Sequence, residues 1–94
     1  MINKFNLSKK VVAITGGAGM LGRMHAEIVS ELGGIPILLD TSIEYIDNVI
    51  ISLSKNGIVA YGFECDITNS NNISEVCQRI IRKFGCIDVL INNA

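Results

Sequence analysis

The chain has 94 residues, of which 49% are hydrophobic and 18% are charged, and its formal net charge is −1. This length allows one small domain, and the composition is that of a folded globular protein. The near-neutral charge does not indicate a partner of nucleic acid or a membrane surface. The local cluster of Arg79, Arg82 and Lys83 is interpreted as a solvated helix face. Residues 1–10 lack the apolar segment of a signal peptide, so we expect a cytoplasmic protein.

The cysteines and the single histidine give no sign of a metal centre. Cys65, Cys77 and Cys86 are odd in number and have no C-x-x-C spacing. This pattern argues against a disulfide framework and against a zinc site. We expect three buried, reduced thiols, no bound metal, and a structural role for His25.

The first predicted elements are a strand over residues 11–15 and a helix over residues 20–32, joined by a turn of small residues. The strand segment is a short valine-rich apolar run, typical of a strand buried on both faces. Gly16, Gly17 and Gly19 allow the backbone to turn sharply and to approach a ligand closely. The free N–H groups and the positive dipole end of the helix then favour a phosphate group. The predicted apolar face of this helix consists of Leu21, Met24, His25, Ile28 and Leu32.

Strands and helices continue to alternate along the rest of the chain. The predicted elements are a strand over 35–39 ending in Asp40, a helix capped by Thr41 or Ser42 and running to about Lys55, a strand over 58–64, a helix capped by Ser70 or Asn71 and running to about Phe84, and a strand over 87–91. The order βαβαβαβ predicts an α/β fold, a Rossmann-like doubly wound parallel sheet with strand order 3-2-1-4. The glycine turn, Asp40, Asp66 and the final Asn-Asn-Ala should converge at the carboxyl ends of the strands.

Asp40 follows the glycine turn by about twenty residues, the separation typical of dinucleotide-binding units. A carboxylate there can accept hydrogen bonds from both hydroxyls of an adenosine ribose, and it would repel a 2′-phosphate. No Arg or Lys occurs at residues 17–19 or at Thr41 to attract that phosphate. The sequence therefore favours NAD over NADP. The alternative interpretation is that Asp40 caps the following helix.

Asp66 lies at the end of the third predicted strand and is a second candidate. Its carboxylate could accept from the adenine amino group, while the backbone of Ile67 could reach a ring nitrogen. As an isolated loop aspartate, however, Asp66 is better interpreted as structural.

Taken together, four segments resemble the N-terminal half of a short-chain dehydrogenase/reductase. These segments are Thr15-Gly-Gly-Ala-Gly-Met-Leu-Gly22, Asp40, Asp66-Ile-Thr68 and Asp88-Val-Leu-Ile-Asn-Asn-Ala94. The resemblance implies that the glycine turn holds the pyrophosphate, that Asp40 selects NAD, and that Asp66 and Ile67 meet the adenine. It implies further that Asn93 and Ala94 touch the cofactor while Asn92 supports the sheet. The implied pyrophosphate residues are Gly16, Gly19, Met20, Leu21 and Gly22.

The chain departs from the family pattern in two respects. Met20 stands where classical members have a glycine, so the glycine spacing is that of extended members, although the other motifs are of the classical type. The family's catalytic Ser and Tyr-x-x-x-Lys follow the Asn-Asn-Ala segment. Here Tyr45 is followed four residues later by Val49, and Tyr61 by Cys65. We therefore expect no catalytic residue in this chain.

The leading hypothesis is that residues 1–94 form one incomplete dinucleotide-binding domain, truncated before the second half of the fold. It would be the NAD(H)-binding portion of an oxidoreductase that transfers hydride between nicotinamide and a carbonyl or alcohol substrate. The 94-residue chain would be inactive alone, and the unpaired apolar edge of its fourth strand should promote homo-oligomers.

Two alternatives remain at the level of sequence. The first is a stand-alone, non-catalytic nucleotide-binding or interaction module. The second is a fragment of an extended-type epimerase or dehydratase acting on nucleotide sugars. A P-loop NTPase is excluded because no Gly-Lys-Ser/Thr follows the glycines.

Overall fold

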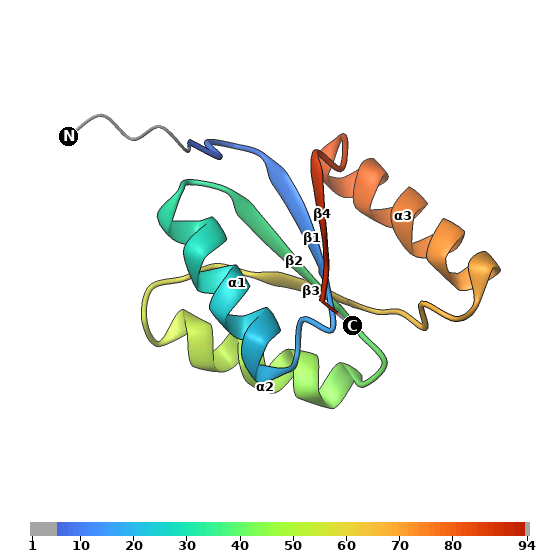
Figure 1. Ribbon diagram of the computed structural model, residues 1–94, viewed down its shortest axis with the longest axis horizontal. Helices are drawn as coiled ribbons and strands as arrows, with labels where there is room; N and C mark the ends of the chain where they lie inside the picture. The colour runs from blue at the N-terminus through green and yellow to red at the C-terminus, as the bar shows by residue number, and fades with distance from the viewer. Residues whose placement is uncertain (1–5, 94) are drawn as a thin grey trace.

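The computed structural model of the protein describes residues 6–93, in which strands and helices alternate (Figure 1). The elements are β1 (Val11–Thr15), α1 (Met20–Glu31), β2 (Ile35–Asp40), α2 (Ile43–Ser54), β3 (Tyr61–Glu64), α3 (Ser70–Phe84) and β4 (Val89–Asn92). The strands form one sheet in the order β3-β2-β1-β4, with every neighbouring pair parallel. The predicted α/β fold and strand order are therefore confirmed.

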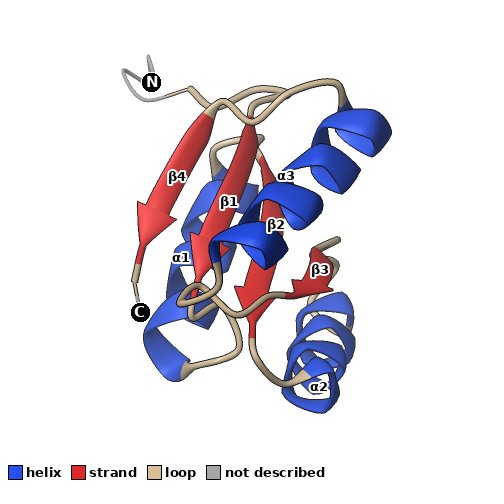
Figure 2. Ribbon diagram, turned by 90° about the vertical axis from the view of Figure 1, so that its right-hand side faces the viewer, coloured by secondary structure: helices blue, strands red, loops and turns tan. Residues whose placement is uncertain are grey.

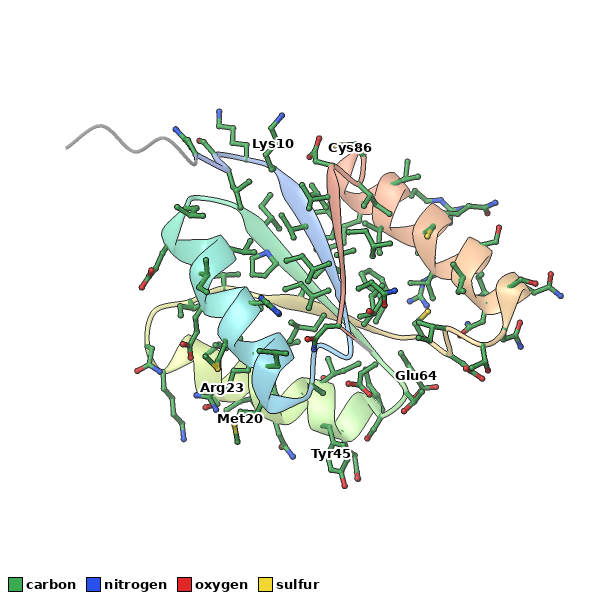
Figure 3. All side chains as sticks on the ribbon, viewed as in Figure 1. Lys10, Met20, Arg23, Tyr45, Glu64 and Cys86 are labelled. Carbon is green, nitrogen blue, oxygen red and sulfur yellow. The ribbon has the colours of Figure 1, made fainter. Side chains whose placement is uncertain are left out.

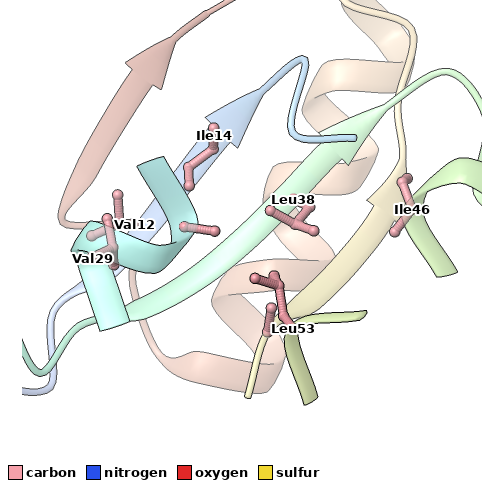
Figure 4. Packing of buried hydrophobic residues seen from close by; sticks show 8 residues of the cluster. Val12, Ile14, Val29, Leu38, Ile46 and Leu53 are labelled. Atoms are coloured by element: carbon pink, nitrogen blue, oxygen red, sulfur yellow. The ribbon is translucent and has the colours of Figure 1, made fainter. Parts of the chain in front are cut away.

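The helices cover both faces of the sheet, with α3 on one face and α1 and α2 on the other (Figure 2). Every residue of β1 is buried. Val12, Ile14 and Leu38 pack towards α1 and α2, where they meet Val29 and Ile46 (Figure 4). The neighbouring residues of the same strands pack towards α3. Burial on both faces explains why β1 and β2 read as continuous apolar runs.

The predicted buried face of α1 is wrong. Gly22, Ala26 and Val29 are the buried residues of this helix. Leu21, Met24 and Ile28 are 55%, 51% and 51% exposed, respectively. Small residues on the inner face allow α1 to lie close to β1 and β2, which turns the larger apolar side chains outward.

Several predicted boundaries also differ from the structure. β3 begins at Tyr61 rather than at residue 58, because the Ile58 N–H donates to Leu53 O at 3.1 Å and closes the end of α2. β4 begins at Val89 rather than at residue 87. Ser42 caps α2, as one of the two predicted residues. The cap of α3 is Asn69, whose side chain accepts from the Asn72 N–H at 3.1 Å.

The expectation of three buried thiols is confirmed for Cys65 alone. Cys65 is buried and Cys77 is half-buried, but Cys86 is exposed. The Cys86 thiol donates to Asp88 Oδ2 at 3.4 Å, and this hydrogen bond raises the pKa of the thiol.

Within residues 6–93, no helix is both long enough and apolar enough to cross a lipid bilayer.

Asp88 joins the start of β4 to the start of β1. Its Oδ2 accepts from the Val11 N–H at 2.8 Å, while its own N–H donates to Val11 O at 2.9 Å. The Val11 N–H, followed by the Cys86 thiol, lowers the pKa of the Asp88 carboxyl from 3.8. The ionised carboxylate thus stabilises the edge of the sheet.

We predict that this stabilisation depends on pH. A carboxyl whose pKa is lower in the folded state stabilises above its unfolded pKa of 3.8, and loses that effect as pH falls through the folded value. The variant Asp88→Asn keeps an acceptor oxygen but does not titrate. Thermal unfolding followed by circular dichroism should show the wild type melting above the variant at neutral pH, with the gap closing as the pH falls below 3.8. A gap that is the same at neutral and at acidic pH would contradict the assignment.

Candidate functional site

The turn after β1 needs residues without a side chain. Gly16 has φ of 64°, a conformation that L side chains rarely adopt. The Gly17 N–H donates to Leu39 O at 3.1 Å, and a Cβ on Gly17 would lie 2.8 Å from Leu38 Cβ. The turn therefore packs directly on the end of β2.

The first turn of α1 faces this glycine turn. Gly19 is the N-cap and offers no side-chain cap, and the first turn carries no acidic residue. Helix geometry leaves the N–H groups of Met20, Leu21 and Gly22 without an acceptor inside the helix. A Cβ on Gly22 would lie 2.7 Å from Gly17 Cα, so backbone lies directly against backbone. The Met20 side chain is 84% exposed and points away from the protein (Figure 3). This arrangement of N–H donors and dipole suits an anion.

Asp40 lies beside the same turn. Its Oδ2 accepts from the Ala18 N–H at 3.0 Å, and its Oδ1 accepts from the Thr41 N–H at 2.7 Å. The interpretation of Asp40 as the cap of α2 is wrong, because Ser42 accepts from the Tyr45 N–H at 3.3 Å and fills that role. A half-buried carboxylate thus adjoins the glycine turn on the β2 side.

A hydroxyl group joins the turn to β4. Thr15 Oγ1 contacts Asn92 Oδ1 at 3.1 Å and accepts from the Asn93 N–H at 2.9 Å. Asn93 Nδ2 in turn donates to Gly16 O at 3.4 Å. Thr15 is 7% exposed, the one polar residue in the buried core of the described chain. The expected structural role of Asn92 is consistent with this contact, and Asn93 lies next to the glycine turn.

The Asp66 side chain forms its hydrogen bonds within its own loop. Its Oδ1 accepts from the Thr68 N–H at 2.9 Å and from the Thr68 hydroxyl at 2.7 Å. The hydroxyl contact is the first cause of the lowered pKa of Asp66, followed by the backbone contact. Ile67 is 40% exposed, and it shares an apolar cavity of about 410 Å³ with Thr15 and Asn92. This cavity lies between α3 and the sheet.

The structure thus gathers most of the predicted residues at one end of the sheet. Gly16, Asp40 and Asn93 meet around the turn, with the N–H groups of the first turn of α1 beside them. Ala94 lies outside the described residues. Thr15 and Ala18 belong to the glycine motif but were not among the predicted site residues. The sequence signal for Thr15 is its position at the end of a buried strand, directly before the glycine turn. Within residues 6–93, no group of three or more His, Cys, Asp or Glu side chains is arranged to hold a metal ion.

A doubly wound parallel sheet with a glycine turn at the switch point defines the class of nucleotide-binding α/β proteins. The sequence profile of the family described as short chain dehydrogenase matches residues 10–94. The chain therefore belongs to the short-chain dehydrogenase family, and the other motifs rather than the glycine spacing predicted the classical type correctly.

Curated relatives extend the match. The chain is 34% identical over 88 residues to an uncharacterized oxidoreductase of Mycobacterium tuberculosis, covering 90% of this chain and 26% of that protein. It is 34% identical over 90 residues to the NAD-dependent glycerol dehydrogenase of Listeria innocua, covering 96% of this chain and 34% of that protein. The chain thus spans between a quarter and about a third of these relatives.

Solved structures share the fold. 2-keto-3-deoxy-D-gluconate dehydrogenase of Streptococcus agalactiae superposes with a TM-score of 0.91 at 36% identity, over 96% of this chain and 34% of that one. NAD⁺-bound xylitol dehydrogenase superposes with a TM-score of 0.85 at 34% identity, over 98% of this chain and 35% of that one. A metagenomic short-chain oxidoreductase in complex with NADP superposes with a TM-score of 0.85 at 28% identity, over 94% of this chain and 40% of that one. Both dinucleotides therefore occur among the similar structures.

We predict that the Thr15 hydroxyl is required for stability. Thr15→Val keeps the shape but leaves the Asn93 N–H without this acceptor, which should lower the free energy of unfolding by about 1–3 kcal/mol. Thr15→Ser retains the hydroxyl and should cost clearly less. Urea unfolding measures both variants. Equal stability of Thr15→Val and Thr15→Ser would show that the hydroxyl does not join the turn to β4.

Proposed function

We propose that this chain is the NAD(H)-binding portion of a short-chain dehydrogenase. The observation that carries the proposal is the Asp40 carboxylate, which adjoins the glycine turn through the Ala18 N–H at 3.0 Å. N–H groups that can donate to a phosphate and a carboxylate that can accept from a ribose would therefore lie side by side at the switch point of the sheet. Bound nicotinamide supplies hydride transfer, and the residues described here would hold the adenosine half of the cofactor.

Each candidate residue has a proposed part in binding. The N–H groups of Met20, Leu21 and Gly22 would face the pyrophosphate. Gly16, with its positive φ, and Gly19, whose N–H donates to Gly16 O at 3.1 Å, would shape the turn that surrounds it. Asp40 would accept from the ribose hydroxyls.

Two further segments, the loop after β3 and the residues after β4, would contact the adenine and support the turn. The Thr68 contacts of Asp66 use Oδ1, so Oδ2 is the proposed acceptor for the adenine amino group, with Ile67 beside it. Asn93 supports the turn through Gly16 O, and Ala94 is proposed to touch the cofactor next to it.

The proposed choice of NAD over NADP follows from charge. A carboxylate at Asp40 would repel a 2′-phosphate, and residues 17–19 and Thr41 offer no cation. The nearest cation along the chain is Arg23, which pairs with Glu27 at 3.6 Å. Such an exposed pair is weak, but it directs the guanidinium along α1.

The domain is proposed to be incomplete in residues 1–94. Leu21, Met24 and Ile28 expose an apolar stripe on α1, and β4 has no neighbour on its outer side within the described sheet. Exposed apolar surface of this kind is typical of a face that packs against more protein. The relatives are about three times as long. The catalytic groups and the substrate site are proposed to lie outside these residues, and the physiological form to be a homo-oligomer in the cytoplasm.

The first test is cofactor affinity. Asp40→Asn retains an acceptor for the Ala18 N–H but removes the charge that repels a 2′-phosphate and that accepts strongly from ribose. NADH affinity should fall about tenfold, equivalent to 1.4 kcal/mol, while NADPH affinity rises or stays constant. Fluorescence titration of the 94-residue chain with both reduced dinucleotides measures the ratio.

Asp47→Asn on α2 is the matched control, because it removes the same charge from an exposed site. An Asp40→Asn protein with the wild-type preference for NADH would overturn the assignment of Asp40. A wild-type chain that binds neither dinucleotide would overturn the proposed function.

The second test concerns chemistry. The 94-residue chain should bind NADH but should give no NADH formation with NAD⁺ and a panel of polyols and secondary alcohols. Absorbance of NADH measures turnover. Any activity that follows the purified chain through size-exclusion chromatography would show that these residues contain catalytic groups.

A further inference from the structure

An open cavity lies at the edge of the sheet formed by β3, away from the glycine turn. It measures about 680 Å³, and none of the proposed cofactor residues lines it. Its floor is β3, one wall is α2 with Ile43 and Ile50, and the other wall is α3 with Arg79, Arg82 and Lys83. We call this cavity the β3 groove.

The floor of the β3 groove has backbone groups available for pairing. β3 pairs with β2 alone in the described sheet. The Cys65 N–H donates to Asp40 O at 2.7 Å, so the peptide groups of residues 63 and 65 point towards β2. Since direction alternates along a strand, the N–H and C=O groups of Gly62 and Glu64 point into the groove.

The wall on the α3 side is cationic and aromatic. The Arg79 guanidinium lies 5.1 Å from the centroid of the Phe63 ring, and the Lys83 ammonium lies 4.9 Å from that of Tyr61. Arg82 is the third cation of this wall. Among the described residues these cations make no ion pair. The sequence-based interpretation of a merely solvated helix face is therefore incomplete, because two of the cations are held over rings of the edge strand.

The two walls differ in chemistry. Tyr61 and Phe63 face α3, whereas a Cβ on Gly62 would meet the Ile46 side chain of α2. Glu64 shares the direction of Gly62, so the one carboxylate of the β3 groove lies on the apolar α2 side. A strand added at this edge would direct alternate side chains to cations and to isoleucines.

We propose that the β3 groove binds an extended peptide segment in which acidic and apolar residues alternate. The peptide backbone pairs with Gly62 and Glu64, its acidic side chains meet Arg79, Arg82 and Lys83, and its apolar side chains cover Ile43 and Ile50. Glu64 repels an acidic side chain on the α2 side, which fixes the direction of the alternation.

A second copy of this chain is a poorer occupant. Pairing of two β3 edges about a twofold axis perpendicular to the sheet would place α3 beside α3, so three cations would face three cations. Edge cations also protect a sheet from aggregation, but protection does not require an apolar wall or an open groove. Charge complementarity therefore favours an acidic partner.

The experiment uses a fluorescein-labelled peptide of about eight residues in which Glu and Val alternate. Fluorescence anisotropy with the 94-residue chain should show saturable binding that weakens at least about tenfold in high salt, where a Debye length of about 3 Å screens the cations. A peptide of the same composition with Glu and Val in two blocks should bind weakly. A peptide N-methylated at alternate amides keeps its side chains but cannot pair, and it should not bind.

Two pairs of variants separate charge from strand pairing. Arg82→Glu should weaken peptide binding at least about tenfold, whereas Lys9→Glu, which changes the net charge equally near the start of β1, should not. Glu64→Pro removes the outward N–H without a loss of bonding to β2, and it should abolish binding. Glu64→Ala keeps that N–H and should bind as tightly as the wild type or more tightly. Circular dichroism confirms that each variant is folded.

The proposal is overturned if no saturable peptide binding occurs, or if the N-methylated peptide and Glu64→Pro bind like their controls, because charge alone would then be responsible. It is also overturned if a single-stranded oligonucleotide binds more tightly than the alternating peptide and is displaced by it. NADH titrations report on the other site, so failure here leaves the proposed cofactor site unaffected.

Discussion

The close approach of α1 to the glycine turn is the constraint on which the candidate site depends. A Cβ on Gly22 would lie 2.7 Å from Gly17 Cα, and one on Gly17 would lie 2.8 Å from Leu38 Cβ. Helix, turn and β2 therefore meet with backbone against backbone. The same absence of side chains that permits this packing leaves the first-turn N–H groups of α1 without a side-chain cap, close to Asp40. Packing and anion binding are thus two consequences of one arrangement.

Periodicity in the sequence predicted those elements whose burial depends on large apolar residues. β1 is wholly buried, and α3 buries Val76 and Ile80 from the predicted stripe. Periodicity did not predict the buried face of α1, because contact there depends on Gly22 and Ala26, which are small and add little to an apolar pattern. It also extended β3 too far, because the apolar Ile58 bonds to the end of α2 and Val59 is 66% exposed.

The candidate site was predictable where the chemistry is local and hidden where it depends on strand pairing. The position of Asp40 at the end of a β-strand is enough to place it near the turn. The role of Thr15 depends on β4 being the neighbour of β1, because its hydroxyl contacts Asn92, which is far away in the sequence. No local pattern in the sequence shows that pairing. Gly62 of β3 is likewise explained only by the fold, because the Ile46 side chain of α2 occupies the place where a side chain at Gly62 would lie.

The two open edges of the described sheet differ in a way that bears on both proposals. β4 exposes Val89 and Leu90 and has no charged residue, as is typical of a strand in the interior of a larger sheet. β3 is flanked by Arg79 and Lys83, whose burial against an apolar strand would cost the free energy of desolvating two cations. An apolar neighbour therefore favours the β4 edge. An acidic neighbour favours the β3 edge, because its carboxylates would offset that desolvation with charge-assisted hydrogen bonds. Under the two proposals, the same sheet would direct further strands of a dehydrogenase to one side and an acidic peptide to the other.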